Sequence, residues 1–376
     1  MSDQSPEHIL LRQNILGADD MMPRITNISS LPVSLPNAFG DVWFASYDDT
    51  NVALKVIRVL AKTISKGRLE ELVKQLKRWT ELRHPNVLTP FGICENKLGI
   101  AIVWPWTGDS GISKYLAQYP MYSRASLVLD VARGLEYLHA QVPAIVHGDL
   151  RLPNILVQRT GQACLTDYGL SPVMHGMPGI EESDFSPSQS HVRWMAPERL
   201  YPESYGLKSS DSFTPASDIF AFGMVVYQLY AGRVPFHETQ SAYGVFYKIT
   251  IVGERPAHPG REAEERGLCD DMWAILEDCW KANGTDRPTS RELVERLERI
   301  TAGQIPATSS LAQVQSSSSP DESLLPENPD PSAPVRSLFF DDTLPVVSPP
   351  STYPTSVRTL GDLYYFMREV LRSNLT

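Results

Sequence analysis

Apolar positions in the first third of the chain follow first a strand period and then a helical period. Residues Val52–Arg58 read VALKVIR and predict a strand, in which Ala53 and Lys55 point to the same face because side chains alternate across a strand. Further along, apolar residues recur at spacings of three and four and predict an amphipathic helix. Its apolar face consists of Leu69, Leu72, Val73, Leu76, Trp79 and Leu82. A strand and a helix with one apolar face are therefore expected in this part of the chain.

The longest apolar stretch, Ile219–Tyr230, predicts a helix inside the protein. It is too short to cross a bilayer and contains Gln228, so no membrane span is expected. Asp218 directly precedes this stretch, which places a carboxylate at the start of an apolar helix.

The pattern divides the chain into three regions. Residues 1–30 are weakly patterned and are expected to be an N-terminal extension, whereas residues 31–301 alternate strand-like and helix-like segments and predict one domain. Residues 302–376 form a Ser- and Pro-rich tail, which is expected to be mostly disordered because it buries too little apolar surface. Within the tail, residues 359–371 have a helical apolar pattern, for which a docking helix and a transient helix without a partner are the two hypotheses. Its apolar positions are Leu360, Leu363, Phe366, Met367 and Val370.

Charge and cysteine content narrow the class of protein. The 376 residues include 44 acidic and 34 basic side chains, a net charge of −10, which argues against nonspecific nucleic-acid binding and against a polybasic membrane anchor. The four cysteines form no C-x-x-C pair, which is typical of reduced thiols. The N-terminus has no basic segment followed by an apolar core. We expect a protein of the cytoplasm or the nucleus.

The candidate chemistry lies between His147 and Gly169. This stretch reads HGDLRLPNILV, then a short turn, then ACLTDYG, so that Asp149 and Asn154 are five residues apart and Asp167 follows a tight hairpin. The spacing resembles the protein-kinase pattern H-R-D-L-x-x-x-N followed by D-F-G. The chain therefore resembles the protein kinase family, most closely its tyrosine-kinase-like branch of serine/threonine kinases. The resemblance implies an α+β fold with two lobes, a small β-rich lobe over residues 31–106 and a larger helical lobe over residues 107–301.

The resemblance also implies ATP and Mg²⁺ as cofactors and assigns roles to five residues. Asp149 would accept or orient the proton of the substrate hydroxyl, while Asn154 and Asp167 would hold the magnesium ions. Lys55 matches the lysine of the V-A-I-K motif, which pairs with the α- and β-phosphates. Arg151 stands where serine/threonine kinases usually carry a lysine and would contact the γ-phosphate.

The adenine site is expected between the lobes, where IAIVWPWTGDSG aligns with the family's linker. The carbonyl of Pro105 and the backbone N–H of Thr107 would bond to the adenine ring. Trp104 falls at the gatekeeper position and is expected to fill the pocket behind adenine as core packing. The other ATP-binding positions that the resemblance implies are Gly40, Val42, Ala53, Lys55, Asn154, Leu156 and Asp167.

Two departures from the family pattern weaken the expected grip on the nucleotide. Leu35 and Asn37 replace the first two glycines of the loop that covers the phosphates, where glycine lets backbone amides approach closely. Gln75 stands where kinases carry the glutamate that pairs with Lys55, while Glu71 lies farther from the apolar stripe and is expected to be solvated. Gln75 can accept a hydrogen bond but carries no charge, which should cost on the order of 1–2 kcal/mol in positioning the lysine.

Three further departures lie near the catalytic loop. Gly148 replaces the arginine that in the family binds a phosphorylated activation loop, so that mode of control is not expected. Tyr168 replaces phenylalanine and keeps an aromatic ring in place. His191 replaces a threonine that in the family bonds the catalytic aspartate, which affects substrate positioning. A catalytic base at His191 is an alternative, but Asp149 already occupies that role.

Three classes of function fit these motifs. An active kinase acting on Ser/Thr of a protein substrate, with weakened activity, is favoured, and a pseudokinase scaffold with the same fold is the main alternative. A small-molecule phosphotransferase of the aminoglycoside type also uses H-G-D, but Ala196-Pro197-Glu198, Asp218 and Arg287 argue for a protein-substrate platform. In the family, the arginine that corresponds to Arg287 pairs with the glutamate that corresponds to Glu198. The sequence leaves the oligomeric state open.

Overall fold

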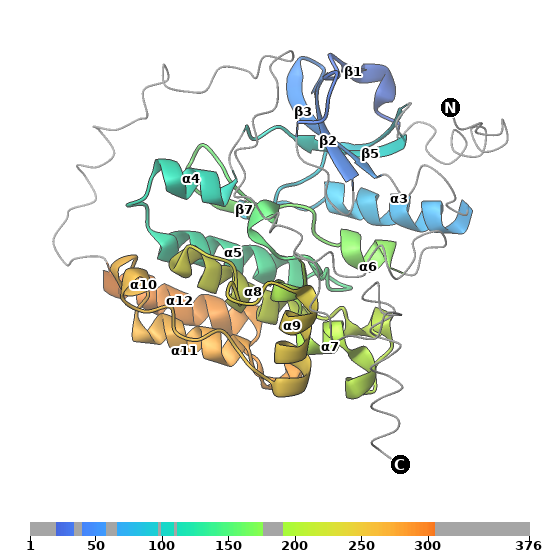
Figure 1. Cartoon of the computed structure of the whole chain (residues 1–376). Helices are drawn as coiled ribbons and strands as arrows, with labels where there is room; N and C mark the ends of the chain where they lie inside the picture. Colours follow the sequence, from blue (N-terminus) through green and yellow to red (C-terminus); the bar gives the residue numbers. More distant parts are fainter. Residues whose placement is uncertain are drawn as a thin grey trace.

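The chain folds into two lobes, a small lobe built on an antiparallel sheet and a larger helical lobe (Figure 1). The expected two-lobed α+β architecture is thereby confirmed. The computed structural model describes residues 20–33, 40–57, 66–96, 99–108, 111–175 and 191–304. Leu35, Asn37 and the segment 359–371 lie outside the described residues, so the expectations about them stay predictions.

The small lobe is a five-stranded sheet in the order β1-β2-β3-β5-β4, and every pair of neighbouring strands is antiparallel. Its strands are β1 (Ile25–Thr26), β2 (Gly40–Tyr47), β3 (Thr50–Ile57), β4 (Gly92–Asn96) and β5 (Gly99–Pro105). The strand predicted from VALKVIR is β3. The 3₁₀ turn η2 (Met22–Arg24) and β1 come from the stretch expected to be an extension, and Met21, Met22 and Ile28 pack on one face of the sheet.

The opposite face of the sheet packs against α3 (Lys66–Thr80), the predicted amphipathic helix. Leu72, Val73, Leu76 and Trp79 are buried on the side of the helix that faces the core. The sheet contributes Ile57, Ile102 and Trp104 to this core. Leu82 is buried although it lies beyond the end of the helix. Burial on both faces explains why β3 and β5 are almost continuously apolar.

The large lobe is built around α8 (Pro215–Ala231), the helix predicted from the longest apolar stretch. Its remaining helices are α4 (Ile112–Gln118), α5 (Arg124–His139), α6 (Leu170–Met174), α7 (Pro197–Leu200), α9 (Ala242–Tyr247), α10 (Arg261–Glu265), α11 (Asp270–Cys279) and α12 (Ser290–Gln304). Short helical turns are η3 (Leu152–Asn154), η4 (His191–Trp194), η5 (Pro202–Tyr205), η6 (Ser209–Ser212), η7 (Lys248–Val252) and η8 (Gly284–Asp286). A two-stranded hairpin, β6 (Ile155–Val157) and β7 (Ala163–Leu165), lies between the lobes.

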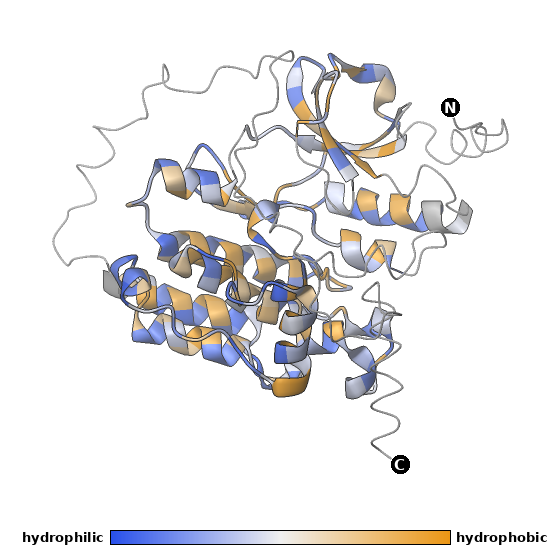
Figure 2. Cartoon of the chain, in the orientation of Figure 1, coloured by the Kyte–Doolittle hydropathy of each residue, from blue (hydrophilic) through white to orange (hydrophobic). Residues whose placement is uncertain are grey.

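Helix α8 is buried on nearly all sides, and Figure 2 shows hydrophobic residues on the helices of the large lobe around it. It begins with a capping box, in which Thr214 accepts from the backbone N–H of Ser217 and the Ser217 hydroxyl accepts in return. It ends at Gly232, whose φ of 70° is the left-handed conformation that terminates many helices. No helix among the described residues is long and apolar enough to cross a membrane.

Candidate active site

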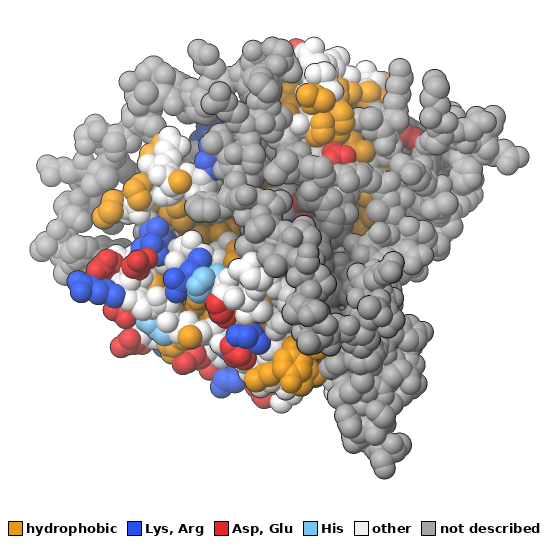
Figure 3. Space-filling view, in the orientation of Figure 1, with side chains coloured by type: hydrophobic (Ala, Val, Ile, Leu, Met, Phe, Trp, Pro, Cys, Tyr) orange, Lys and Arg blue, Asp and Glu red, His pale blue; other side chains and the backbone are white. Residues whose placement is uncertain are grey.

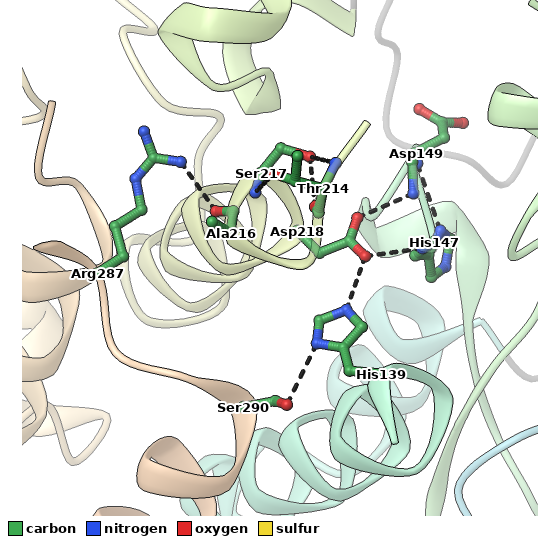
Figure 4. A network of polar contacts seen from close by, with 10 residues as sticks. His139, His147, Asp149, Thr214, Ala216, Ser217, Asp218, Arg287 and Ser290 are labelled. Carbon is green, nitrogen blue, oxygen red and sulfur yellow. Dashed lines mark hydrogen bonds and ion pairs between the residues drawn. The ribbon is translucent and has the colours of Figure 1, made fainter. Parts of the chain in front are cut away.

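The loop that carries His147, Gly148 and Asp149 is held by a buried carboxylate, Asp218, at the start of α8 (Figure 4). The backbone N–H of His147 donates to Asp218 Oδ2 at 2.7 Å, and that of Gly148 donates to Oδ1 at 2.9 Å. His139 Nε2 lies 2.9 Å from Oδ2, and its Nδ1 lies 3.2 Å from Ser290 Oγ. One carboxylate therefore ties the loop to α5, α8 and α12. Sequence reasoning identified Asp218 but missed His139, because no local motif marks a histidine at the end of a helix.

Gly148 fits its backbone position better than any larger residue would. Its φ is +76°, a conformation that residues with a Cβ rarely adopt. A Cβ built there would lie 2.8 Å from Pro172 Cδ and 3.2 Å from Phe213 Cδ1. The neighbouring side chains are thus packed around a glycine, and an arginine at this position would require them to move.

Asp149 is mostly enclosed, with its side chain 10% exposed, in a cluster of hydrogen-bond donors. Arg151 Nε lies 2.9 Å from Asp149 Oδ1 and its Nη2 lies 3.2 Å from Oδ2, a bidentate ion pair. Asn154 Nδ2 donates to the Asp149 backbone carbonyl at 2.7 Å and to Oδ2 at 3.1 Å. Burial of the Asp149 carboxyl favours its neutral form, but the Arg151 guanidinium and His191 outweigh this and lower its pKa to about 2. The group is therefore a carboxylate at neutral pH.

His191 lies next to Asp149 and is uncharged at neutral pH. Its Nδ1 is 3.5 Å from Asp149 Oδ1, longer than a good hydrogen bond. Burial, with a smaller contribution from the Arg151 charge, lowers the pKa of His191 to about 4 in spite of the opposing effect of Asp149. Both His191 and Asp149 line a small cavity beneath η4. Its other lining residues are Gly148, Leu150, Trp194, Met195, Ala196, Arg199, Ser217, Asp218 and Ala221.

Lys55 and Asp167 join the two lobes. Lys55 is almost fully buried in β3, and its Nζ forms an ion pair with Asp167 Oδ2. Asp167 has a φ of +62°, which is rare for a residue with a side chain. The backbone N–H of the preceding Thr166 donates to the Asn154 carbonyl at 3.0 Å, which brings Asn154 beside Asp167. The three residues predicted around the phosphates and metal ions therefore lie together.

Tyr168 anchors the segment that carries Asp167. Its ring is fully buried and makes edge contacts with Trp79 and Trp104, at centroid distances of 5.8 and 5.9 Å. Its hydroxyl donates to the Leu88 carbonyl at 2.9 Å, a contact that phenylalanine cannot make. Trp104 is 3% exposed, so its predicted role in core packing is confirmed. The aromatic column links α3, β5 and the Asp167 segment.

Strand register places two of the remaining ATP-site candidates, Val42 and Ala53, close to Lys55. Val42 of β2 pairs with Lys55, and Ala53 pairs with Trp104 across β3 and β5. The other candidates lie at the ends of strands or beside them. Gly40 begins β2, Pro105 ends β5, Thr107 follows Pro105, and Leu156 of β6 forms a bridge with Gly111. The sheet and the β6 hairpin thus bring these residues to the junction between the lobes.

Gln75 lies on the partly exposed flank of α3. Its Nε2 donates to Glu71 Oε1 at 2.8 Å along the helix surface. Glu71 is exposed, as predicted. The charged partner that the structure shows for Lys55 is Asp167, on the large lobe.

The predicted pair of Glu198 and Arg287 is confirmed. Arg287 Nη1 and Nη2 donate to the two carboxylate oxygens of Glu198 at 2.6 and 2.8 Å, and both side chains are buried. Arg287 also donates to the Ala216 carbonyl at 2.8 Å, next to Asp218. This bidentate pair fixes α7 against the start of α8.

Similarity to known proteins agrees with this geometry. A family model described as protein tyrosine and serine/threonine kinase matches residues 36–297. Serine/threonine-protein kinase CTR1 of Arabidopsis thaliana is 27% identical over 278 residues, which cover 72% of this chain and 31% of the relative. Mitogen-activated protein kinase kinase kinase 10 of Homo sapiens is 27% identical over 278 residues, covering 70% of this chain and 26% of the relative.

A third relative, serine/threonine-protein kinase VIK of Arabidopsis thaliana, is 26% identical over 290 residues, covering 75% of this chain and 62% of the relative. The chain therefore spans between about a quarter and three fifths of the length of these relatives. The family model covers well over half of the chain, and the motifs that it shares with kinases lie together at the lobe junction. The chain belongs to the protein kinase family.

Proposed function

We propose that this protein transfers the γ-phosphate of ATP to Ser or Thr hydroxyls of a protein substrate, with weakened activity. The observation that carries the proposal is the ion pair between Lys55 of the small lobe and Asp167 of the large lobe. It brings the lysine proposed for the α- and β-phosphates within contact of the carboxylate proposed for magnesium. The three relatives described above are named Ser/Thr kinases or a kinase kinase kinase, which supports the Ser/Thr preference.

The side chains around Asp167 fit a magnesium ion that is bound together with a nucleotide. Asn154 directs its amide nitrogen at Asp149, which leaves its carbonyl oxygen as the available ligand, and Asp167 uses only Oδ2 for Lys55. Both are the hard oxygen donors that Mg²⁺ prefers. The described residues hold no cluster of three or more His, Cys, Asp or Glu that could bind a metal by itself. Phosphate oxygens of ATP would therefore complete the coordination.

Asp149 and Arg151 explain both how the proposed phosphate transfer would proceed and why its activity would be weak. We assign Asp149 to orient the substrate hydroxyl and accept its proton, since its low pKa keeps it ionised. The same low pKa makes it a weak base, and both of its oxygens accept from Arg151. Arg151 must turn partly from Asp149 to contact the γ-phosphate. Because Gln75 is uncharged, Lys55 lacks the glutamate partner that kinases carry at this position of α3.

The proposal extends to the limits of the domain and to the remaining contacts of the nucleotide. The catalytic domain is assigned to residues 31–301, with Pro105 and Thr107 at the adenine ring, and the protein is assigned to the cytoplasm or nucleus. The register that places Pro105 at the end of β5 supports the adenine contacts, and the family match over residues 36–297 supports the domain limits.

A phosphorylation assay tests the proposal. Purified protein with MgATP should phosphorylate a generic protein substrate or itself, and Asp149→Asn should abolish the signal while Asp271→Asn, an exposed change on α11, should retain it. Equal signals from wild type and Asp149→Asn would identify a contaminating kinase and refute catalysis by this chain.

A pseudokinase scaffold is the second candidate, favoured by the bidentate Arg151–Asp149 pair that occupies the catalytic carboxylate. The two candidates are separated by combining the assay with a thermal-shift titration. A ligand that binds the folded state raises the melting temperature by mass action. MgATP should raise the melting temperature of the wild type and not that of Asp167→Asn. A shift without phosphorylation would favour a nucleotide-binding pseudokinase, and no shift in either form would favour a scaffold.

A further inference from the structure

The helical run formed by α9 and η7 is apolar on two sides. Ala242, Val245 and Ile249 are buried at the helical spacing expected of a face packed on the core. On the other side Tyr247 is 41% exposed, Ile251 39% and Val252 58%. A surface helix normally presents polar residues outward, and a helix that is apolar all round is usually covered by a further partner. The outer side of this run is therefore an unusual surface.

The exposed apolar residues of α9 and η7 form a concentrated patch. Tyr247, Ile251 and Val252, called here the η7 patch, fall within six consecutive positions, and the Tyr243 ring lies 6.2 Å from that of Tyr247 in a tilted arrangement. Figure 3 shows hydrophobic side chains gathered at the lower edge of the large lobe, where η7 lies. The most exposed apolar residues elsewhere in the described chain, Met121 and Val142, lie in loops apart from this run and from one another. Contiguous exposed apolar patches mark interaction sites, whereas single exposed residues do not.

A polar rim borders the η7 patch. Lys248 pairs with Glu254 at 2.8 Å and with Glu238 at 3.3 Å. One ammonium group therefore contacts two carboxylates, so these rim charges are engaged with one another. An apolar centre with a self-paired rim fits an apolar helix face better than a charged peptide.

We propose that the η7 patch is the docking site of this chain's own segment 359–371, TLGDLYYFMREVL. Its apolar positions Leu360, Leu363, Phe366, Met367 and Val370 recur at helical spacing, the pattern with which an amphipathic helix binds an apolar surface. The proposal concerns regulation or stability of the domain and is independent of whether the protein transfers phosphate.

The connecting chain is long enough for this contact. Helix α12 ends at Gln304, and residues 305–358 connect it to the segment. A flexible chain of roughly fifty residues has a root-mean-square span of about 40 Å. A domain of about 270 residues has a radius of gyration of about 18 Å. The segment can therefore reach the domain surface, where tethering gives it an effective concentration on the order of millimolar. A separate partner would have to compete with that concentration.

Hydrogen–deuterium exchange on the full chain tests the proposal. Peptides covering residues 359–371 should be protected at least fivefold relative to residues 310–330, and Ile251→Glu should remove that protection. Met121→Glu, on a residue that is 94% exposed outside the patch, is the matched control and should leave it unchanged. In the reciprocal variant Phe366→Glu, exchange across α9 and η7 should rise. Equal melting temperatures of the Ile251 and Met121 variants exclude a general loss of folding.

Three outcomes would overturn the proposal. The first is a segment that exchanges as fast as residues 310–330 in the wild type, which would leave the patch to an outside partner. The second is protection of the segment that persists in Ile251→Glu, because the segment would then bind elsewhere. The third is protection that grows with protein concentration together with a dimer mass in light scattering, which would assign the patch to a second copy of the chain.

Discussion

Of two buried tyrosine hydroxyls, one is hydrogen-bonded and the other is not. Removal of the first should lower the stability of the fold, whereas removal of the second should not. Tyr168 Oη donates to the Leu88 carbonyl at 2.9 Å, whereas Tyr230 Oη is buried and has no hydrogen-bond partner among the described residues. The two side chains are 0% and 1% exposed, so replacement by phenylalanine removes the same atom from equally buried sites. The difference between the two variants therefore isolates the hydrogen bond.

The magnitudes follow from the partners. Tyr168→Phe loses a bond with a net contribution of about 0.5–1.5 kcal/mol and leaves the Leu88 carbonyl without its donor, so a total loss of about 1–2 kcal/mol is expected. Tyr230→Phe removes a polar group that was transferred from water without compensation, so it should be neutral or stabilise by up to about 1 kcal/mol. In a domain of this size, the Tyr168 variant should melt about 2–6 °C lower.

Equilibrium unfolding in urea measures both variants. The midpoint should fall for Tyr168→Phe and stay or rise for Tyr230→Phe, with the slope m unchanged in each case. A shift of equal size and sign in both variants would refute the reasoning, because it would show that the Leu88 contact contributes nothing beyond the loss of a buried oxygen.

Three further changes test the packing and charges around the catalytic loop. Gly148→Ala should destabilise by about 2 kcal/mol or more in urea unfolding, because its φ is +76° and a Cβ would meet Pro172; an unchanged midpoint would contradict the steric argument. Arg287→Ala should cost about 3–5 kcal/mol because it leaves the Glu198 carboxylate buried and unpaired, and adding Glu198→Gln should recover part of this loss. His191 is neutral in the folded protein, because its pKa is lowered from 6.5 to about 4. Its contribution to the free energy of unfolding is therefore fully present above pH 6.5 and is lost as the pH falls towards 4, where the unfolded chain binds a proton that the folded one does not. Between pH 7 and pH 5 the free energy of unfolding should therefore fall by about 2 kcal/mol more in the wild type than in His191→Asn, and equal pH dependence of both proteins would refute the buried neutral state.

Local patterns predicted the elements of the site better than the contacts between its side chains. The positions of β3, α3, α8 and the β6 hairpin followed from spacing alone, because a strand or helix repeats over a few residues. The Glu198–Arg287 pair was also predicted, through the family resemblance. The resemblance suggested a contact between Gln75 and Lys55, and the structure shows a Gln75–Glu71 bond and a Lys55–Asp167 ion pair. It suggested a γ-phosphate contact for Arg151, which pairs with Asp149 in the structure.

The sequence by itself determined the alternation of strands and helices, the family, and the identity of the candidate catalytic residues, because each of these is encoded in short spacings along the chain. Only the tertiary structure decided how those residues are charged and held. Lys55 and Asp167 are 112 positions apart, and the donors that lower the pKa of Asp149 come from two different segments. Burial and the distance between charges set these properties, and both arise only when distant segments pack together.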